Sequence, residues 1–324
     1  MLPSIKDMNS QVQTAEYTVE RLSSDNIKDV AVLHNMVYNR KQPEVFFQKK
    51  YDTVYTGAAY IGYVAYNASR FPIAYYGVIP TLLSYNGETI LAAQSADTMT
   101  HPQFRYAGLF TALAKQTFDL CIAEGIQLVF GFPNQNSLPG FIGKLNWQLT
   151  EHMDCFIIPV QGGLPLEKLA NKFSFLKPMY NWYSNRLLNK FSVSQPDVAN
   201  SVLSDNYNGV LRDEGYLHYK SYSTTRVIQI NQSKLWIKLQ HGLTIGDAEI
   251  TKTDFDTTMN QLMKLARKLG ITQIQFHTSP HTSLHALFAE RYQPVTSFPI
   301  IFKDLSSGLQ LKSIKFTFAD IDVF

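Results

Sequence analysis

One stretch of this chain restricts its possible folds more than any other, the segment from Thr89 to Phe132. It opens with a β-rich run over 89–99 and continues through a loop that ends at Gly108. Apolar residues then recur at helical spacing until Gly125, and glycine often follows the last turn of a helix. The apolar run over 126–132 indicates a buried strand. Strand, loop, helix and strand in this order predict a mixed α/β fold.

The elements before this segment fit the same fold. A strand over 17–22 and a helix over 27–38 are followed by β-rich runs between 60 and 83. Asn86-Gly87 then predicts a hairpin, because both residues tolerate the positive φ angles of a two-residue turn.

The length of the chain, 324 residues, fits two domains better than one. After a strand over 153–160, the run Gly162-Gly163-Leu164-Pro165 interrupts the regular pattern. A second β-rich block begins at Val210. We therefore predict three parts: a first domain over 1–160, a helical connector over 161–209 and a second domain over 210–324.

The second half repeats part of the first. A helix ends at Gly125 in one half and at Gly270 in the other, and a short strand follows in both. Trp147-Gln148 and Tyr292-Gln293 lie at equal distances after these two glycines. This repetition favours a duplication.

Composition excludes several classes of protein. Hydrophobic residues make up 45% of the chain and aromatic residues 13%, too many for a disordered protein. The net charge is only +3 and no dense run of Lys and Arg occurs, which argues against nucleic-acid binding. No run approaches the roughly 20 apolar residues of a membrane helix, and residues 1–10 lack the apolar core of a signal peptide. We expect a soluble, cytoplasmic protein with no membrane partner, and the oligomeric state stays open.

The two cysteines, Cys121 and Cys155, are too few for a disulfide framework or a metal site. We expect buried free thiols in a reducing compartment. No metal is implied.

The loop between His101 and Gly108 carries the strongest indication of chemistry. Gly108 opens an amphipathic helix, so backbone N–H groups and the positive end of a helix dipole meet there. A glycine also lets a ligand approach the backbone without a clash with Cβ. This arrangement, with Arg105 beside it, is suited to a pyrophosphate group. A strand-to-helix turn without a ligand is the simpler alternative.

This loop resembles motif A of the GNAT N-acetyltransferase superfamily, which reads Arg/Gln-x-x-Gly-x-Gly/Ala. Arg105 and Gly108 occupy the first and fourth positions. Phe110 departs from the sixth, and its ring must point away from a cofactor bound there. The run Phe-Ile-Gly-Lys-Leu-Asn-Trp over 141–147 resembles the segment Phe-Tyr-x-Lys-Leu-Gly-Phe that closes motif B. The resemblance covers about residues 15–160, and the second half is similar only in pattern.

The resemblance implies two GNAT-like domains, each a mixed central sheet flanked by helices, the second degenerate. Only the first would bind acyl-coenzyme A, with acetyl-CoA as the cosubstrate. The residues implied as cofactor contacts are Thr98, Met99, Thr100, Arg105, Tyr106, Ala107, Gly108, Leu109, Phe110, Thr111, Asn134 and Asn136.

Acyl transfer to an amine with a pKa of about 10 requires a base or a desolvating pocket. The positions at which the family often carries a base and an acid are Gln94 and Ile142, and neither side chain exchanges protons. Asp97 is a candidate base, but strand alternation turns it to the other face unless a β-bulge intervenes. A hydrogen bond within the turn or ladder explains Asp97 equally well. Tyr75, Tyr76 or Tyr106 could replace the acid, or the thiolate could leave without one.

The tandem arrangement also resembles the enhanced-intracellular-survival acetyltransferases, in which a C-terminal carboxylate enters the first active site as base. This chain ends in Asp322-Val323-Phe324. The resemblance implies Phe324 or Asp322 as a catalytic residue. The alternative is that the end of the chain is only a last edge strand.

These observations predict an acyl-CoA-dependent N-acyltransferase that acetylates a primary amine of a small molecule such as an amino sugar. A Fem-type aminoacyl-tRNA-dependent transferase is one alternative, although the loop at Arg105 and the modest charge count against it. A non-catalytic module that binds acyl-CoA or a partner is the other, and Gln94 and Ile142 keep it open. The aromatic run over 180–183 is expected either to line a site or to hold the domains together.

Overall fold

The computed structural model describes residues 17–105, 107–193, 200–305 and 308–324. Its first half consists of β1 (Tyr17–Arg21), α1 (Ile27–Tyr38), α2 (Glu44–Tyr51), β2 (Ile61–Asn67), β3 (Pro72–Tyr85), β4 (Glu88–Thr100), α3 (Leu109–Ala123), β5 (Leu128–Gly131), α4 (Leu138–Leu145) and β6 (Gln148–Pro159). The second half consists of α5 (Leu166–Lys172), α6 (Lys177–Leu188), α7 (Ser201–Ser204), β7 (Gly209–Val210), α8 (Glu214–Tyr219), β8 (Thr225–Ile230), β9 (Ser233–Leu239), β10 (Leu243–Glu249), α9 (Phe255–Lys268), β11 (Gln273–Thr278), α10 (Ser283–Ala289) and β12 (Pro294–Asp304). The mixed α/β fold predicted from the sequence is confirmed.

The predicted hairpin is present. β3 and β4 are joined by Asn86 and Gly87, whose φ angles are 50° and 84°. Two positive φ angles match the twist of the flanking strands, and the hairpin fixes the register of β4 against β3.

The described strands form one mixed sheet in the order β1-β2-β3-β4-β5-β12-β6-β11-β10-β9-β8, with β7 beside β3. β4 pairs with β5 in parallel, and β10 pairs with β11 in the same way. The other pairs of named strands are antiparallel.

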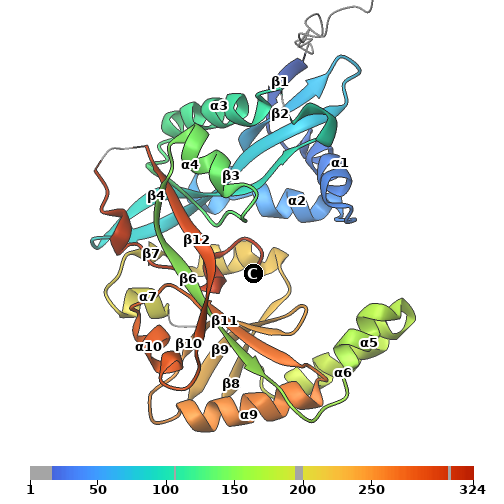
Figure 1. Ribbon diagram of the computed structural model, residues 1–324, viewed down its shortest axis with the longest axis vertical. Coiled ribbons are helices and arrows are strands. Elements are labelled where there is room, and N and C mark those ends of the chain that lie inside the picture. The colour runs from blue at the N-terminus through green and yellow to red at the C-terminus, as the bar shows by residue number, and fades with distance from the viewer. Residues whose placement is uncertain (1–16, 106, 194–199, 306–307) are drawn as a thin grey trace, which may run out of the picture.

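The two halves exchange strands. β12 comes from the second half but lies between β5 and β6 of the first. β6 comes from the first half but also pairs with β11 of the second. These two long strands therefore run from one half to the other (Figure 1). The domain boundaries at 160 and 210 stay a prediction. The strands of the two halves are hydrogen-bonded to each other in one sheet.

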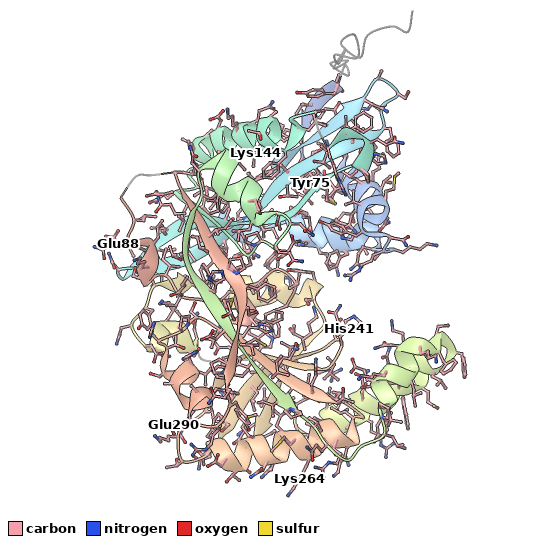
Figure 2. All side chains as sticks on the ribbon, viewed as in Figure 1. Tyr75, Glu88, Lys144, His241, Lys264 and Glu290 are labelled. Atoms are coloured by element: carbon pink, nitrogen blue, oxygen red, sulfur yellow. The ribbon has the colours of Figure 1, made fainter. Side chains whose placement is uncertain are left out.

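Helices cover both faces of the first half. α3 and α4 pack on one face through a cluster that includes Leu113, Phe141 and Trp147. α1 and α2 pack on the other face, where Tyr75 is buried (Figure 2). In the second half, α9 and α10 pack on β10 and β11 through apolar side chains such as Leu262.

The sequence predicts a β-rich block from Val210 onward, and this is wrong for residues 214–222. These residues form α8 and a 3₁₀ turn over Lys220–Tyr222. The side chain of Asp213 accepts a hydrogen bond of 2.8 Å from the backbone N–H of Tyr216 and so caps the helix. β-prone tyrosines are tolerated here because their rings pack against other aromatic residues, as Tyr219 does on Tyr55.

The chain's own C-terminal segment fills the gap between β10 and β11. The two strands stop pairing at Ile245 and Phe276. Beyond that point β11 bridges to Thr317. The buried ring of Phe324 lies against Gly246 so closely that a Cβ there would be 2.2 Å from the ring. The second half therefore keeps the strand divergence of the first but fills it with its own side chains.

Candidate active site

A cleft opens in the first half between β4 and β5, the pair of parallel strands that corresponds to β10 and β11 in the second half. β4 and β5 pair over only three positions, the last being Gln94 with Phe130. Beyond this pair the strands separate around a cleft of about 310 Å³. Its lining comes from α1 and the residues after it, β4, the end of β5 and the segment after it, β12 and the end of the chain: His34, Tyr38, Arg40, Ser95, Ala96, Asp97, Thr98, Gly131, Phe132, Pro133, Asn134, Ser137, Phe141, Ile301, Asp322 and Val323.

β4 contains a bulge where it borders the cleft. Tyr75 pairs with Met99 and Gly77 with Ala96, so two residues of β4 oppose one of β3. Asp97, one of the two, has a φ of 50°. The sequence analysis required a β-bulge for Asp97 to face the site. This bulge is present, and Asp97 lines the cleft.

A buried lysine joins Asp97 to the end of the chain. Lys50 Nζ donates to Asp97 Oδ2 at 2.6 Å and to Asp322 Oδ2 at 2.7 Å. Tyr51 also donates to Asp97, at 3.0 Å, and Gln94 Nε2 donates to Asp322 Oδ1 at 2.8 Å. The lysine side chain is only 3% exposed. The structure thus brings two of the predicted catalytic residues together around Lys50.

The electrostatics of this cluster are determined by burial and by mutual attraction. Burial alone lowers the pKa of Lys50, but the carboxylates of Asp322 and Asp97 outweigh it and raise that pKa. Burial likewise favours the neutral form of Asp322, but Lys50 lowers the pKa of this carboxyl below its ordinary value. Two carboxylates and one ammonium give this cluster one net negative charge, which favours a cationic group at the cluster, while Arg40 also lines the cleft.

His34 on α1 is a further titratable residue of the cleft that the sequence analysis missed. Its Nδ1 is buried and has no hydrogen-bond partner among the described residues. Burial lowers the pKa of His34, an effect that the charge of Asp97 partly offsets. A neutral imidazole with an unpaired nitrogen can accept a proton. The sequence does contain a signal for this residue, because His34 is a histidine within the core-facing pattern of α1.

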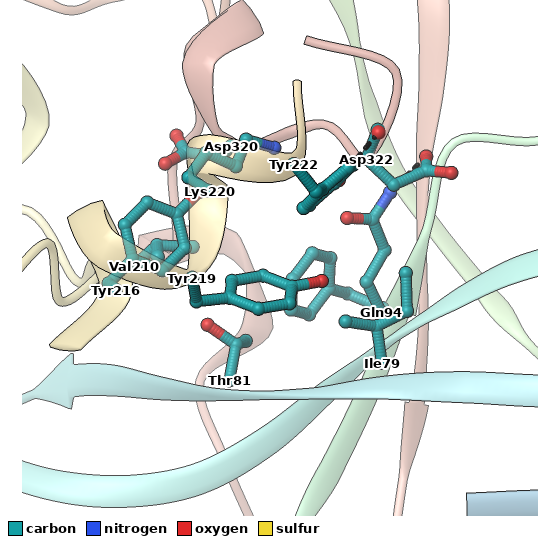
Figure 3. Close-up of a pocket in the computed structure, with 11 residues that line it drawn as sticks. Ile79, Thr81, Gln94, Val210, Tyr216, Tyr219, Lys220, Tyr222, Asp320 and Asp322 are labelled. Carbon is teal, nitrogen blue, oxygen red and sulfur yellow. Dashed lines mark hydrogen bonds between the residues drawn. The ribbon is translucent and has the colours of Figure 1, made fainter. Parts of the chain in front are cut away.

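A small cavity lies beside Asp322 (Figure 3). Its volume of about 20 Å³ is enough for about one water molecule. Asp322 is the one described residue that lines both cavity and cleft. Lys220 also lines the cavity, and its Nζ donates to the Ile321 carbonyl at 2.7 Å. Burial lowers the pKa of Lys220 to about 7.

The loop before α3 is where the sequence predicts a pyrophosphate to bind. Residues Pro102–Phe104 form a 3₁₀ turn, and Arg105 is exposed. Gly108 precedes α3 with a φ of 71°, and no heavy atom lies within 4 Å of the position that a Cβ would take. The backbone at the start of α3 is therefore open. Tyr106, also predicted to contact the cofactor, lies outside the described residues.

The predicted cofactor contacts on β4 and α3 differ in where their side chains point. Thr98 lines the cleft, and Thr100 pairs with Ala74. Met99 and Leu109 are buried in the two cores, so only their backbones can face a ligand. Ala107 is exposed, and Thr111 is half-buried.

Phe110, the departure from motif A, turns its ring into the core. Its ring centroid lies 5.5 Å from that of Phe141 and 5.9 Å from that of Tyr76. The backbone at Phe110 therefore stays clear of its own ring, as the sequence analysis required.

Asn134 and Asn136 follow β5. Asn134 lines the cleft, but its Oδ1 accepts hydrogen bonds from the backbone N–H groups of Asn136 at 2.9 Å and Ser137 at 3.1 Å. This Asx turn leads into α4, so Asn134 has a structural role. Asn136 is exposed and does not line the cleft.

Phe324 differs in position from Asp322. Its ring is buried against Gly246, Trp236 and Phe318 in the second half. The cleft receives Asp322 and Val323 from the end of the chain. The segment ends in a 3₁₀ turn and a loop after Asp320, so the alternative of a last edge strand is wrong.

Residues 18–150 match the family described as Acetyltransferase (GNAT) domain. Over these residues the chain is similar to GNAT acetyltransferase domains. No curated protein matches the chain in sequence.

Solved structures show the same fold over most of the chain. A GCN5-related N-acetyltransferase from Kribbella flavida is 10% identical, with a TM-score of 0.58, 92% of this chain covered and 73% of that one. A probable N-acyltransferase from Enterococcus faecalis is 11% identical, with a TM-score of 0.58, 90% of this chain covered and 73% of that one. The N-myristoyltransferase of Saccharomyces cerevisiae with bound myristoyl-CoA is 11% identical, with a TM-score of 0.54, 89% of this chain covered and 82% of that one. At such identities the similarity establishes the GNAT fold.

The described part of the chain contains no group of three or more His, Cys, Asp or Glu side chains arranged to hold a metal ion. None of its helices is both long and apolar enough to cross a membrane.

Proposed function

We propose that this protein is an acyl-CoA-dependent N-acyltransferase that transfers an acetyl group to a primary amine of a small molecule. One observation carries the proposal. β4 separates from β5 after Gln94, and the same strand leads through the Arg105 loop to the open start of α3 at Gly108. A thioester arm in the cleft and a pyrophosphate at the helix N-terminus would then be held by one continuous segment.

The reaction forms one bond and breaks one. The bound ammonium loses a first proton and becomes a neutral amine, whose nitrogen attacks the thioester carbonyl carbon so that the C–N bond forms. The C–S bond then breaks, and the second proton passes from the nitrogen to the leaving thiolate. We assign binding of the incoming ammonium to the negative charge of Asp97 and Asp322. We assign removal of the first proton to His34, which lines the cleft and whose Nδ1 has no hydrogen-bond partner among the described residues.

Two other groups have proposed roles. Tyr38 lines the cleft, and burial raises the pKa of its hydroxyl, which therefore stays protonated at neutral pH and can serve as an acid. Phe324, predicted as catalytic, anchors the end of the chain through its ring, while its terminal carboxylate stays a candidate base. Tyr75 and Tyr76 are buried and do not line the cleft, which supports a packing role.

The proposal includes the acceptor, the tandem type and the cytoplasmic location that the sequence predicts. An amino sugar is a suitable acceptor because the cluster at Lys50 favours an ammonium group. The tandem type is supported by the divergence of β10 from β11, which repeats that of β4 from β5. The buried free thiols Cys121 and Cys155 are compatible with the cytoplasm.

Calorimetric titration with acetyl-CoA tests the proposal. We expect binding by the wild type, weaker binding by Arg105→Ala, and none by Gly108→Trp, whose side chain would fill the open space before α3. Gly108→Ala is the matched control, because it introduces a side chain at the same positive φ without the bulk. Thiol release with a panel of amines then tests transfer. Absence of binding by folded wild type would overturn the proposal, and binding without turnover for any amine would favour the non-catalytic module.

A further inference from the structure

Residues 164–190 form a helical arm that projects from the second half (Figure 1). It consists of α5, a 3₁₀ turn over Ser174–Leu176, and α6. Two tyrosines of α6 attach it to the end of α9: Tyr180 donates to the Leu269 carbonyl at 3.0 Å, and Tyr183 donates to the Lys268 carbonyl at 2.8 Å. The aromatic run of the connector therefore holds the arm in place through these two residues.

Leu187 and Leu188 pack on the core of the second half, but six other large apolar side chains of the arm are exposed. Phe175 is 76% exposed, and Met179 and Trp182 are each 63% exposed. Leu164, Leu169 and Phe173 are exposed as well. Single exposed apolar residues are ordinary on protein surfaces, but a group of six within one projecting element marks an interaction surface.

The arm is also strongly basic. Its cations are all exposed: Lys168, Lys172, Lys177, Arg186 and Lys190. Its one acidic residue, Glu167, is buried and accepts a hydrogen bond of 3.0 Å from the backbone N–H of Gly242. The arm thus has a net charge of +4, whereas the whole chain has +3, so the remainder of the protein is slightly negative. Positive charge is concentrated where the apolar side chains are exposed.

Cations and aromatic rings alternate closely on this surface. Lys172 Nζ lies 5.6 Å from the ring centroid of Phe173, and the guanidinium carbon of Arg186 lies 5.7 Å from that of Trp182. Basic side chains beside Trp, Phe and Leu are typical of elements that lie in the headgroup region of an anionic bilayer.

We propose that the arm binds the surface of anionic lipid membranes. The apolar side chains at Phe175 and Trp182 enter the boundary between headgroups and acyl chains, while the lysines contact the acidic headgroups. A second copy of the chain is a poorer occupant, because a symmetric contact between two arms would bring like charges together. The sequence analysis predicts no membrane partner because it finds no segment long enough to span a bilayer. An arm that lies in the headgroup region does not need such a segment.

Co-sedimentation of the full chain with lipid vesicles tests the proposal. We expect binding to vesicles of phosphatidylcholine with phosphatidylserine, little binding to phosphatidylcholine alone, and loss of binding at high salt. Each lysine near an anionic surface changes binding about fivefold, so Lys172→Gln with Lys177→Gln should weaken it about 25-fold. Lys115→Gln with Lys264→Gln is the matched control, since the loss of charge is equal and both lysines are exposed, Lys115 on α3 and Lys264 on α9. Figure 2 labels Lys264.

The apolar contribution is tested separately. Phe175→Ser with Trp182→Ser should abolish binding, whereas Val54→Ser with Ile122→Ser, which replaces exposed apolar residues elsewhere, should not. All four positions are exposed, so the variants should fold. Failure of the wild type to bind phosphatidylserine vesicles, or equal effects of arm and control variants, would overturn the proposal. So would a wild-type dimer that becomes monomeric when Phe175 and Trp182 are replaced.

Discussion

Lys50 and Asp322 are 272 positions apart in the chain, and the Nζ of one lies 2.7 Å from the Oδ2 of the other. This contact joins α2 of the first half to the last residues of the second, at the edge of the cleft. Asp97 completes the cluster from the bulge of β4. The proposed active site therefore depends on elements from both ends of the sequence.

Replacement of Lys50 with Met should destabilise the protein strongly. It leaves two carboxylates close together in a buried place, and breaking a buried pair on one side costs about 3–5 kcal/mol. Arg21→Met is the control, because it removes an exposed pair with Glu124 that is worth about 1 kcal/mol or less. Urea denaturation at neutral pH measures both. Equal free energies of unfolding for the two variants would contradict this account of the cluster.

Replacement of His34 with Gln should lower kcat/KM for acyl transfer by about 10²–10⁴-fold, the range for loss of a general base. Binding of acetyl-CoA should change little, as measured by calorimetry. Because the pKa of His34 is lowered, the acid limb of the wild-type profile of kcat/KM against pH should have its midpoint below the ordinary histidine pKa of about 6.5. His152→Gln, on an exposed part of β6, should leave the rate unchanged. An unaltered acid limb in His34→Gln would remove His34 from the mechanism.

Lys220 gives stability a distinct pH dependence. Its folded-state pKa of about 7 lies below the unfolded value of about 10.4. Between these values the unfolded chain binds more protons, so the contribution of Lys220 to stability rises as pH increases. The stability of Lys220→Met relative to wild type should therefore be highest near pH 7 and fall toward pH 10. Chemical denaturation across this window measures the difference, and a constant difference would exclude a lowered pKa.

Gly246 and Phe324 should be strongly coupled. Gly246→Ala places a Cβ against the Phe324 ring and should displace the C-terminal segment, with loss of stability and of acyl transfer. Phe324→Ala leaves a cavity and should cost about 3–5 kcal/mol. In the double variant the added methyl group meets no ring, so the two effects should be less than additive. Additive free energies of unfolding would show that the ring does not occupy this place in solution.

The same segment predicts the stoichiometry of ligand binding. Because residues near Phe324 fill the gap between β10 and β11, the described part of the second half has no open counterpart of the cleft at this position. Calorimetry should give one acetyl-CoA per chain, and two sites of similar affinity would contradict the filled gap.

Much of the first half follows from local sequence patterns. Asn86-Gly87 specifies its hairpin through backbone conformation alone, and the spacing of apolar residues after Gly108 specifies α3 and the strand after it. The loop at Arg105 was identifiable for the same reason, since its function depends on a glycine at a fixed offset from a helix start. These features involve residues close together in the chain, whose conformational preferences the sequence displays directly.

The charged cluster, the strand exchange and the filled second cleft could be determined only by the tertiary structure. Lys50 lies in α2, a short helix with a weak amphipathic pattern, and nothing near it in sequence indicates a carboxylate partner. Asp97 faces the cleft because pairing with β3 imposes a bulge, and Asp322 reaches it because Phe324 is anchored on Gly246. Each depends on contacts between residues that are distant in the chain, such as Lys50 and Asp322, which are 272 positions apart, and such contacts leave no local periodicity in the sequence.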